Sequence, residues 1–292
     1  MATTTTSTYL SIENNLARYQ KMVASEPTVK TATDYYAANI GKVTSIKDLV
    51  GNYRLLSYAL TAYGLSDQAN NKALVTKVLQ GGYTSSKALA NTLSNPNWKN
   101  FAKAFSYLSS GTTATSETIS AAASTTESDY TEQQLENQEG KQDVGVQLAL
   151  YFKRVAPTIT SAYSVLGDEN LLEAFQTIFG ITLNTNGNID NNASIVSRLM
   201  PMSDLTNSKK LDQLVERFCA QYTVLYSSGG TDASSPLEVY NSGTTATSSS
   251  LDAATSIMSS IVSGNSSYGV SSTTQSLSSV LLNSLQSLSL GG

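Results

Sequence analysis

The chain has 292 residues, of which 40% are hydrophobic and only 14% are charged, and its formal net charge is −4 at pH 7. This balance, without any run of Lys or Arg, argues against the basic surfaces that bind nucleic acid or an anionic membrane. Because the chain has no histidine and a single cysteine, its composition excludes Ser-His-Asp and Cys-His catalysis, His-ligated and all-Cys metal sites, iron–sulfur clusters and intramolecular disulfides.

Carboxylate or lysine chemistry and oxygen-bound hard cations remain open. No apolar run reaches the roughly 20 residues of a membrane span, so we expect no membrane insertion. Residues 1–10 form a Thr/Ser tract without the basic and apolar regions of a cleaved signal peptide. We therefore expect a protein that stays in the cytoplasm or is exported without that signal. The lone Cys219 lies in an apolar stretch and is predicted to be a small buried side chain.

Apolar residues at helical spacing predict several helices in the first part of the chain. The expected ranges are 13–24, 28–41, 45–64, 69–81, 85–93 and 98–108. Ser45 and Asp48 resemble a capping box at the start of the third helix, and Gly64 is expected to end it. Trp98 and the phenylalanines after it are read as core residues, because aromatic stripes at helical spacing are usually buried.

Residues 109–128 contain few large apolar side chains and are read as a linker or extended loop. A kinked helix is then expected from Glu132 to beyond Pro157, with one buried face. That face comprises Leu148, Phe152, Val155, Ile159, Tyr163 and Leu166. Later helices are expected over 168–180, with Asp168 and Gly180 as caps, around 195–200 and over 208–226.

From residue 227 onward, Ser, Thr and Gly dominate, and only two faint helical stripes of apolar residues remain. Their candidate partner-binding positions are Leu251, Ile257, Ile261, Leu277, Leu281, Leu285 and Leu288. Such a segment is either disordered alone or folds on a partner. We expect the stripes to pack on another subunit or on a partner protein, because apolar faces of this kind are unfavourable in water.

An internal repeat is suspected, because similar strings recur in the same order. Leu55-Leu56 with Ala62–Leu65 matches Leu171-Leu172 with Ile178–Ile181, each 116 residues later. LVTKVL resembles IVSRLM at an offset of 121, and FAKAF resembles LVERF at an offset of 113. Coincidence is a serious alternative for any one pair, but three ordered pairs favour a duplicated helical unit at about 45–108 and 163–226.

Three motifs are explained by structure without a functional site. The loop 184–190 is rich in Asn but has its glycine at the wrong position for a calcium-binding loop and no following glutamate. Glu132, Glu136 and Glu139 are read as a solvated helix face. The adjacent Lys153 and Arg154 are read as a surface pair near the kink. None of these predicts a catalytic, cofactor or metal site.

The expected fold is all-α, a helical bundle of two related multi-helix units. The predicted organisation is an N-terminal unit at 8–108, a linker at 109–130, a second unit at 131–226 and a tail at 227–292.

Several blocks of the sequence together resemble one family. They are EPTVKTATDYYAANIGKVTSIKDLVGNYRLLSYALTAYGLSD (26–67), NKALVTKVLQGG (71–82), NPNWKNFAKAFSY (95–107), GVQLALYFKRVAPTITSAYSVLGD (145–168) and KLDQLVERF (210–218). The family is a domain of unknown function found in alphaproteobacteria and often encoded among flagellar genes. The resemblance covers about residues 8–226 and implies an all-helical protein connected with the flagellum, without known catalytic residues.

The leading hypothesis is a flagellum-associated structural or accessory protein, extracellular and either exported or assembled, that contacts flagellar components or itself through helices. The low content of Cys, His and Trp and the abundance of Ser, Thr and Asn are typical of flagellar axial proteins. The first alternative is a cytoplasmic chaperone or regulator of flagellar export. The second is an enzyme that uses carboxylates only, for which no residue spacing gives support. No cofactor is expected.

Overall fold

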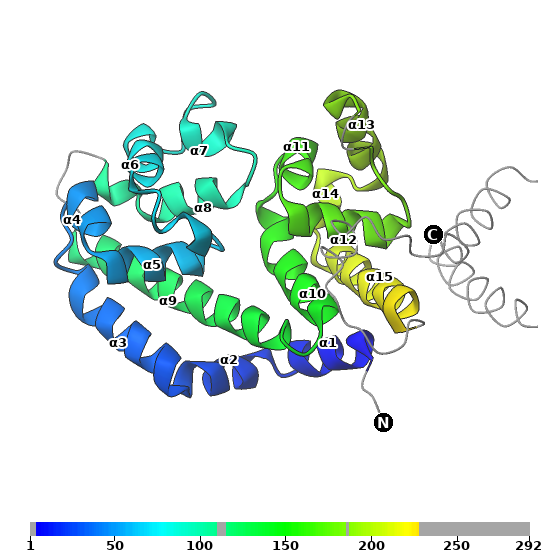
Figure 1. Cartoon of the computed structure of the whole chain (residues 1–292), viewed down its shortest axis with the longest axis horizontal. Coiled ribbons are helices and arrows are strands. Elements are labelled where there is room, and N and C mark those ends of the chain that lie inside the picture. The colour runs from blue at the N-terminus through cyan, green and yellow to red at the C-terminus, as the bar shows by residue number, and fades with distance from the viewer. Residues whose placement is uncertain (1–3, 110–114, 185–186, 228–292) are drawn as a thin grey trace, which may run out of the picture. The chain divides into compact units, whose positions relative to one another are not determined.

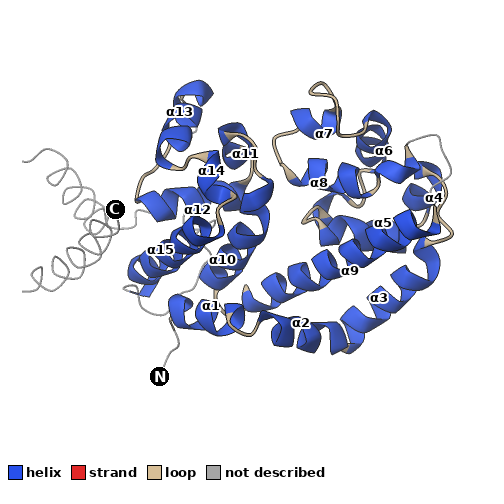
Figure 2. Ribbon diagram, turned by 180° about the vertical axis from the view of Figure 1, so that it is seen from behind, coloured by secondary structure: helices blue, strands red, loops and turns tan. Residues whose placement is uncertain are grey.

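The computed structural model describes residues 4–109, 115–184 and 187–227. Within these ranges every regular element is a helix and no strand occurs (Figures 1 and 2). The predicted all-α class is therefore confirmed for this part of the chain. The tail predicted at 227–292 lies outside the described residues, except for its first residue.

The first elements are α1 (Thr5–Glu13), α2 (Leu16–Ser25), α3 (Pro27–Ile40), α4 (Ile46–Gly51), α5 (Tyr53–Ala62), η1 (Ser66–Gln68), α6 (Lys72–Gly81), α7 (Leu89–Thr92), α8 (Asn97–Ala104) and η2 (Ser106–Leu108). The later elements are α9 (Ser116–Glu139), α10 (Val144–Val155), η3 (Ala156–Thr158), α11 (Ala162–Leu166), α12 (Glu169–Phe179), α13 (Ile189–Leu199), α14 (Met202–Leu205) and α15 (Ser208–Ser227).

The predicted helix at 45–64 is two helices. Ser45 caps α4 as expected, with its hydroxyl accepting from the Asp48 amide at 3.1 Å. Asp48 completes the cap differently from a capping box, because its carboxylate accepts from the Thr44 amide. The break falls at Asn52, whose backbone is extended and whose side chain caps α5 by accepting from the Leu55 amide. A second N-cap inside the apolar stripe therefore overrides its periodicity.

The predicted linker at 109–128 is wrong from residue 116 onward, where α9 begins. Thr115 caps this helix by accepting from the Thr118 amide at 3.3 Å. The segment has few large apolar residues, so its own sequence gives a weak helical signal. It is stabilised by packing instead, because α9 lies against α5 and α10 and buries Thr126 and Leu135.

The predicted kinked helix from 132 is also divided. α9 ends at Glu139, and Asp143 caps α10 by accepting from the Gly145 and Val146 amides. Four positions of the expected buried face after this break, from Leu148 to Ile159, are buried. The prediction that Tyr163 is buried is wrong, because this residue lies on the separate helix α11 and is 50% exposed.

Two hydrophobic cores occupy the described chain. The first core is built from α3 to α8 and includes the predicted core residues Trp98, Phe101 and Phe105. The second core is built from α10 to α15 and includes Cys219, which is buried as predicted. We call the residues of α3–α8 the first half and those of α10–α15 the second half.

The N-terminal helices do not follow the predicted boundary of the unit at 8–108. Tyr9 and Ile12 of α1 and Val23 of α2 belong to the second core. α1 lies against α10 and α15, while α2 and α3 lie along α9 (Figure 1). The chain therefore starts on the second half, runs along α9 and only then builds the first half.

The two halves repeat the same helix starts. Ser45 and Ser161 cap α4 and α11, each by accepting from the amide three residues later. Asn52 and Asp168 cap α5 and α12 in the same way, at 3.2 and 3.0 Å. Both pairs are separated by the 116 residues of the suspected duplication.

The two halves also repeat the same helix end. Gly64 and Gly180 have left-handed φ values of 68° and 62°, which glycine adopts without steric cost. After each glycine, the next amide bonds back to the carbonyl five residues earlier, from Leu65 to Leu60 and from Ile181 to Gln176. This is the Schellman pattern that ends a helix. The recurrence of start, length and end supports a duplicated unit.

Candidate functional site

The predicted partner-binding positions fall beyond the described residues. They are Leu251, Ile257, Ile261, Leu277, Leu281, Leu285 and Leu288. The structure therefore neither brings them together nor separates them, and they stay a prediction.

The last described turns of α15 are apolar and exposed. Val224, Leu225 and Tyr226 follow one another, and Leu225 and Tyr226 each expose 45% of their surface. The ring of Tyr226 contacts that of Tyr222, with centroids 4.3 Å apart and the ring planes tilted by 39°. Consecutive helix residues point about 100° apart, so these side chains surround the end of the helix and leave that end apolar. The chain continues from this surface into the segment with the predicted apolar stripes.

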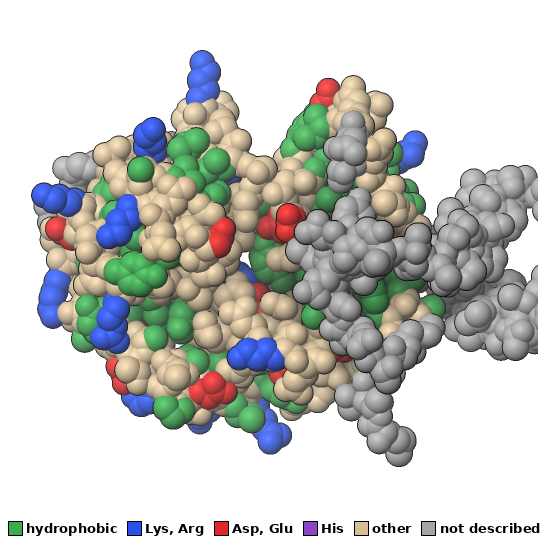
Figure 3. Space-filling view, viewed as in Figure 1, with side chains coloured by type: hydrophobic (Ala, Val, Ile, Leu, Met, Phe, Trp, Pro, Cys, Tyr) green, Lys and Arg blue, Asp and Glu red, His purple; other side chains and the backbone are tan. Residues whose placement is uncertain are grey.

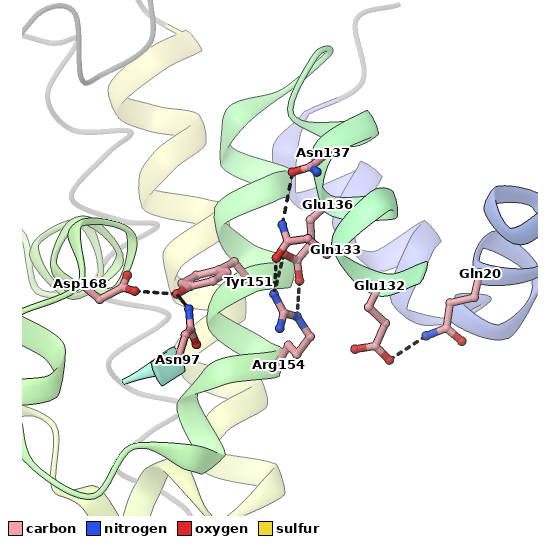
Figure 4. A network of polar contacts seen from close by, with 9 residues as sticks. All are labelled: Gln20, Asn97, Glu132, Gln133, Glu136, Asn137, Tyr151, Arg154 and Asp168. Atoms are coloured by element: carbon pink, nitrogen blue, oxygen red, sulfur yellow. Dashed lines mark hydrogen bonds and ion pairs between the residues drawn. The ribbon is translucent and has the colours of Figure 1, made fainter. Parts of the chain in front are cut away.

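A buried polar network joins the two halves (Figure 4). The Tyr151 hydroxyl on α10 donates to Asp168 Oδ2 at 2.6 Å. It accepts from Asn97 Nδ2, at the start of α8, at 2.9 Å. Because Asn97 belongs to the first half and the other two residues to the second, this chain of bonds clasps the halves together. All three residues are buried.

Next to this clasp, Arg154 pairs with acidic and amide groups of α9 (Figure 4). Its Nε and Nη2 donate to the two carboxylate oxygens of Glu136 at 2.6 and 2.9 Å. Nη2 also donates to Gln133 Oε1 at 2.9 Å. This two-pronged geometry is the strongest form of a carboxylate–guanidinium pair. It ties α9, which spans both halves, to α10 of the second half.

The predictions that Glu136 lies on a solvated helix face and Arg154 at the surface are wrong. Only 3% of the Glu136 side chain and 16% of the Arg154 side chain are exposed. Local sequence suggests a charged surface at both places. The two residues face each other because α9 and α10 pack side by side, and charges buried in this way are usually paired. Lys153, next in sequence, does lie nearer the surface and pairs with Asp212.

Burial shifts the pKa values of Arg154 and of the acidic groups near it. Burial raises the pKa of the Asp129 and Glu132 carboxyls, and the nearby Arg154 charge lowers them in part. Burial also raises the pKa of Asp168, against the hydrogen bonds from Tyr151 and two backbone amides. For Arg154, burial alone would lower the pKa, but the Glu136 charge raises it above its usual range. The guanidinium is therefore the fixed charge that keeps this part of α9 in place.

Close backbone approach at Gly167 accompanies the clasp. A Cβ on Gly167 would lie 2.4 Å from the Ser94 carbonyl oxygen, so no other residue fits there without a shift. Asn100 of α8 adds a third contact by donating to Thr158 Oγ1 at 3.2 Å. The turn before α8 and the first turns of α8 are thus seated on the start of α12 and the end of α10.

Two open depressions lie elsewhere on the described surface. One, of about 630 Å³, is lined by residues of α4 and the start of α5, including Gly51, Asn52 and Lys42. The other, of about 710 Å³, lies between α11 and α13 and includes Tyr163, whose hydroxyl donates to Asp190. Lys and Arg side chains are scattered singly on the face shown in Figure 3, among mostly uncharged atoms.

No group of three or more His, Cys, Asp or Glu side chains within the described ranges could hold a metal ion. None of the described helices combines the length and apolar character needed to cross a membrane. Burial raises the pKa of the Cys219 thiol to about 12, so this side chain stays protonated within the second core.

The described chain is thus an all-helical protein with the same helix caps recurring in its two halves, which a buried polar clasp joins. It belongs to the family described as "Protein of unknown function (DUF1217)", whose model matches residues 62–211. It is similar to a protein of Agrobacterium tumefaciens with an X-ray crystal structure, with 33% sequence identity and a TM-score of 0.68. The match covers 77% of this chain and 97% of that one. No curated protein matches the chain.

Proposed function

We propose that the protein is a flagellum-associated structural or accessory protein that is exported and acts through helix-mediated protein contacts. The family resemblance read from the sequence motivates the flagellar association. The single structural observation that supports action through contacts is the exposed apolar end of α15, comprising Val224, Leu225 and Tyr226.

The energetic argument rests on what covering this end would contribute. Full burial of a large apolar side chain contributes about 1.5–3 kcal/mol relative to exposure. Leu225 and Tyr226 are about half exposed, so a partner would gain roughly half of this amount at each. Tyr226 also contacts the ring of Tyr222 within its own helix, and such a contact lowers the ordering cost of binding.

A location experiment in the native organism tests the flagellar part of the proposal. Flagella are sheared off, cells and supernatant are separated, and the protein is blotted in wild type and in a strain lacking flagellar export. We expect the protein in the sheared fraction of the wild type and its loss from that fraction in the mutant. Protein found only in the cytosol of both strains would refute export and favour a cytoplasmic chaperone or regulator.

Paired substitutions test the contact surface. Leu225→Ser and Tyr226→Ser remove apolar surface from the end of α15, and Met22→Ser removes a similarly exposed apolar side chain from α2. We expect the first two variants to be depleted from the sheared fraction and the third to match wild type. Thermal unfolding of each purified variant verifies that the fold is kept. Equal recovery of all three would show that the end of α15 is not the contact surface.

A further inference from the structure

The Tyr151–Asp168 bond of the clasp has a counterpart in the first half. The residues 116 positions before Tyr151 and Asp168 are Tyr35 and Asn52. Asn52 Nδ2 donates to the Tyr35 hydroxyl at 3.1 Å. A tyrosine therefore bonds to the helix-cap residue at equivalent positions of both halves. The duplicated unit therefore carries this tyrosine–cap pair twice, on α3 with α5 and on α10 with α12.

In the second half this pair is covered from within the chain. Asn97 of the first half donates to Tyr151, and the Ser94 backbone lies against Gly167. Asn100 reaches Thr158 from the same helix. We call the surface around Tyr151, Thr158 and Gly167 the seat. The segment that occupies it, from Ser94 to Asn100, we call the plug.

In the first half the corresponding seat is open. The counterparts of Thr158, Gly167 and Asp168 are Lys42, Gly51 and Asn52, and all three line the depression of about 630 Å³. A Cβ added at Gly51 would meet nothing within 4 Å, whereas its counterpart at Gly167 is in tight contact. Tyr53, also lining the depression, is 52% exposed. The position that the plug covers in one half is therefore an uncovered hollow in the other.

The second half in turn has an unused plug. The offset of 113 between FAKAF and LVERF places Asn207, Lys210 and Gln213 at the positions of Ser94, Asn97 and Asn100. All three are exposed, in the turn before α15 and in its first turns. The bonds of this segment are local, because Asn207 Oδ1 accepts from the Lys210 amide and Lys210 Nζ donates to Asp204 Oδ1 at 2.6 Å. Within the described residues, one chain thus carries an open seat on its first half and an exposed, undocked plug on its second.

We propose that copies of this chain associate head to tail, with the plug of one copy at Asn207–Gln213 docking in the open seat of the next at Gly51 and Asn52. The occupant is a second copy because each copy carries both complementary surfaces, and their counterparts already bind each other within the chain. A contact between two different patches does not close on itself as a two-fold dimer does. It continues into rings or filaments.

The chemistry of the pair is retained in part. Lys210 stands where Asn97 donates to a tyrosine hydroxyl and is also a donor, and the Gln213 amide oxygen can accept from Lys42. Lys42 and Arg54 make the open seat more positive than its counterpart, which has Thr158 and Asn170 at those positions. The Asp48 carboxylate also lines the seat, and the Lys210 ammonium is paired with Asp204, so docking exchanges this partner of Lys210 for groups of the seat.

Sedimentation velocity of the full chain across a concentration series measures this association. We expect a shift from monomer towards dimer and longer species as the protein concentration rises. Gly51→Trp adds bulk to the open seat at a position where a Cβ meets nothing within 4 Å. It should remain monomeric, while Lys21→Trp on exposed α2 should associate like wild type.

A mixing experiment identifies the geometry. Gln213→Trp, at an exposed plug position of α15, blocks the plug and leaves the seat intact, so this variant alone should also stay monomeric. Mixed with Gly51→Trp, it should form dimers and nothing longer, because only one competent plug and one competent seat remain. Thermal unfolding of both variants verifies that each is folded.

A wild-type chain that stays monomeric over the whole series overturns the inference. So does association that survives Gly51→Trp, or a mixture of the two variants that forms no dimer. The inference depends on the internal repeat and not on the flagellar proposal. A chain that sediments as proposed but is found only in the cytosol would therefore refute export while leaving head-to-tail association standing.

Discussion

Arg154 offers the sharpest test of how the fold is held together. Its guanidinium makes the two-pronged pair with Glu136 and a further bond to Gln133, in a position where the glutamate is almost fully buried. Arg154→Met keeps the length and packing of the side chain but removes its charge. Glu136 is then left as a buried carboxylate without its partner.

The expected loss is large. Removing one partner of a buried ion pair typically costs about 3–5 kcal/mol. The cost should grow with pH, because Asp129 and Glu132 also lose the positive charge that partly offsets their burial. Their folded-state pKa values are raised, so their charged forms disfavour the fold, and that penalty appears as pH rises. The deficit of Arg154→Met should therefore be greater at pH 7 than near pH 5.

Urea unfolding of the full chain at both pH values measures this loss. The double variant Arg154→Met with Glu136→Leu replaces the pair by apolar groups, which is often neutral or stabilising. We expect it to recover most of the stability that the single variant loses. A single-variant loss below about 1 kcal/mol, or a double variant as unstable as the sum of both singles, would refute a structural role for the pair.

Three further predictions concern the clasp, the glycine pair and the tail. Burial raises the folded-state pKa of Asp168, so its ionised form weakens the fold as pH rises. As pH falls from 7 towards 5, wild type should therefore gain stability relative to Asp168→Asn, and thermal unfolding measures this difference. Gly167→Ala should destabilise the chain by about 1–3 kcal/mol, because its Cβ would clash with the Ser94 backbone. Gly51→Ala should be neutral or slightly stabilising. Equal effects of the two substitutions in urea unfolding would contradict the packing at Gly167. A chain lacking residues 228–292 should still unfold cooperatively by circular dichroism, because both cores lie between Tyr9 and Tyr222, and loss of cooperativity would show that the tail contributes to a core.

Much of the local structure could be read from the sequence. Apolar periodicity located most helices, and the caps at Ser45 and Asp168 were expected from residue type and position. The ending glycines at 64 and 180 were likewise expected, and both adopt the left-handed backbone. These signals are readable because capping and periodicity act between residues only a few positions apart.

The clasp could not be read in this way. Asn97 and Tyr151 are 54 residues apart, and Arg154 and Glu136 are 18 apart across a helix break. The one available signal was the suspected repeat at about 45–108 and 163–226, which aligns Asp168 with Asn52 but begins after Tyr35 and Tyr151. Even so, the repeat could not show which copy of the pair is covered.

The all-helical class, most helix starts and ends, and the core aromatics depend on local chemistry and spacing, and could therefore be predicted. Long-range packing is what makes residues from 116 onward a helix, brings α1 to the second core, and buries Glu136 and Arg154. The physical reason is common to all three. A weakly apolar helix or a charged side chain takes its place from whatever packs against it, and that partner lies far away in the sequence.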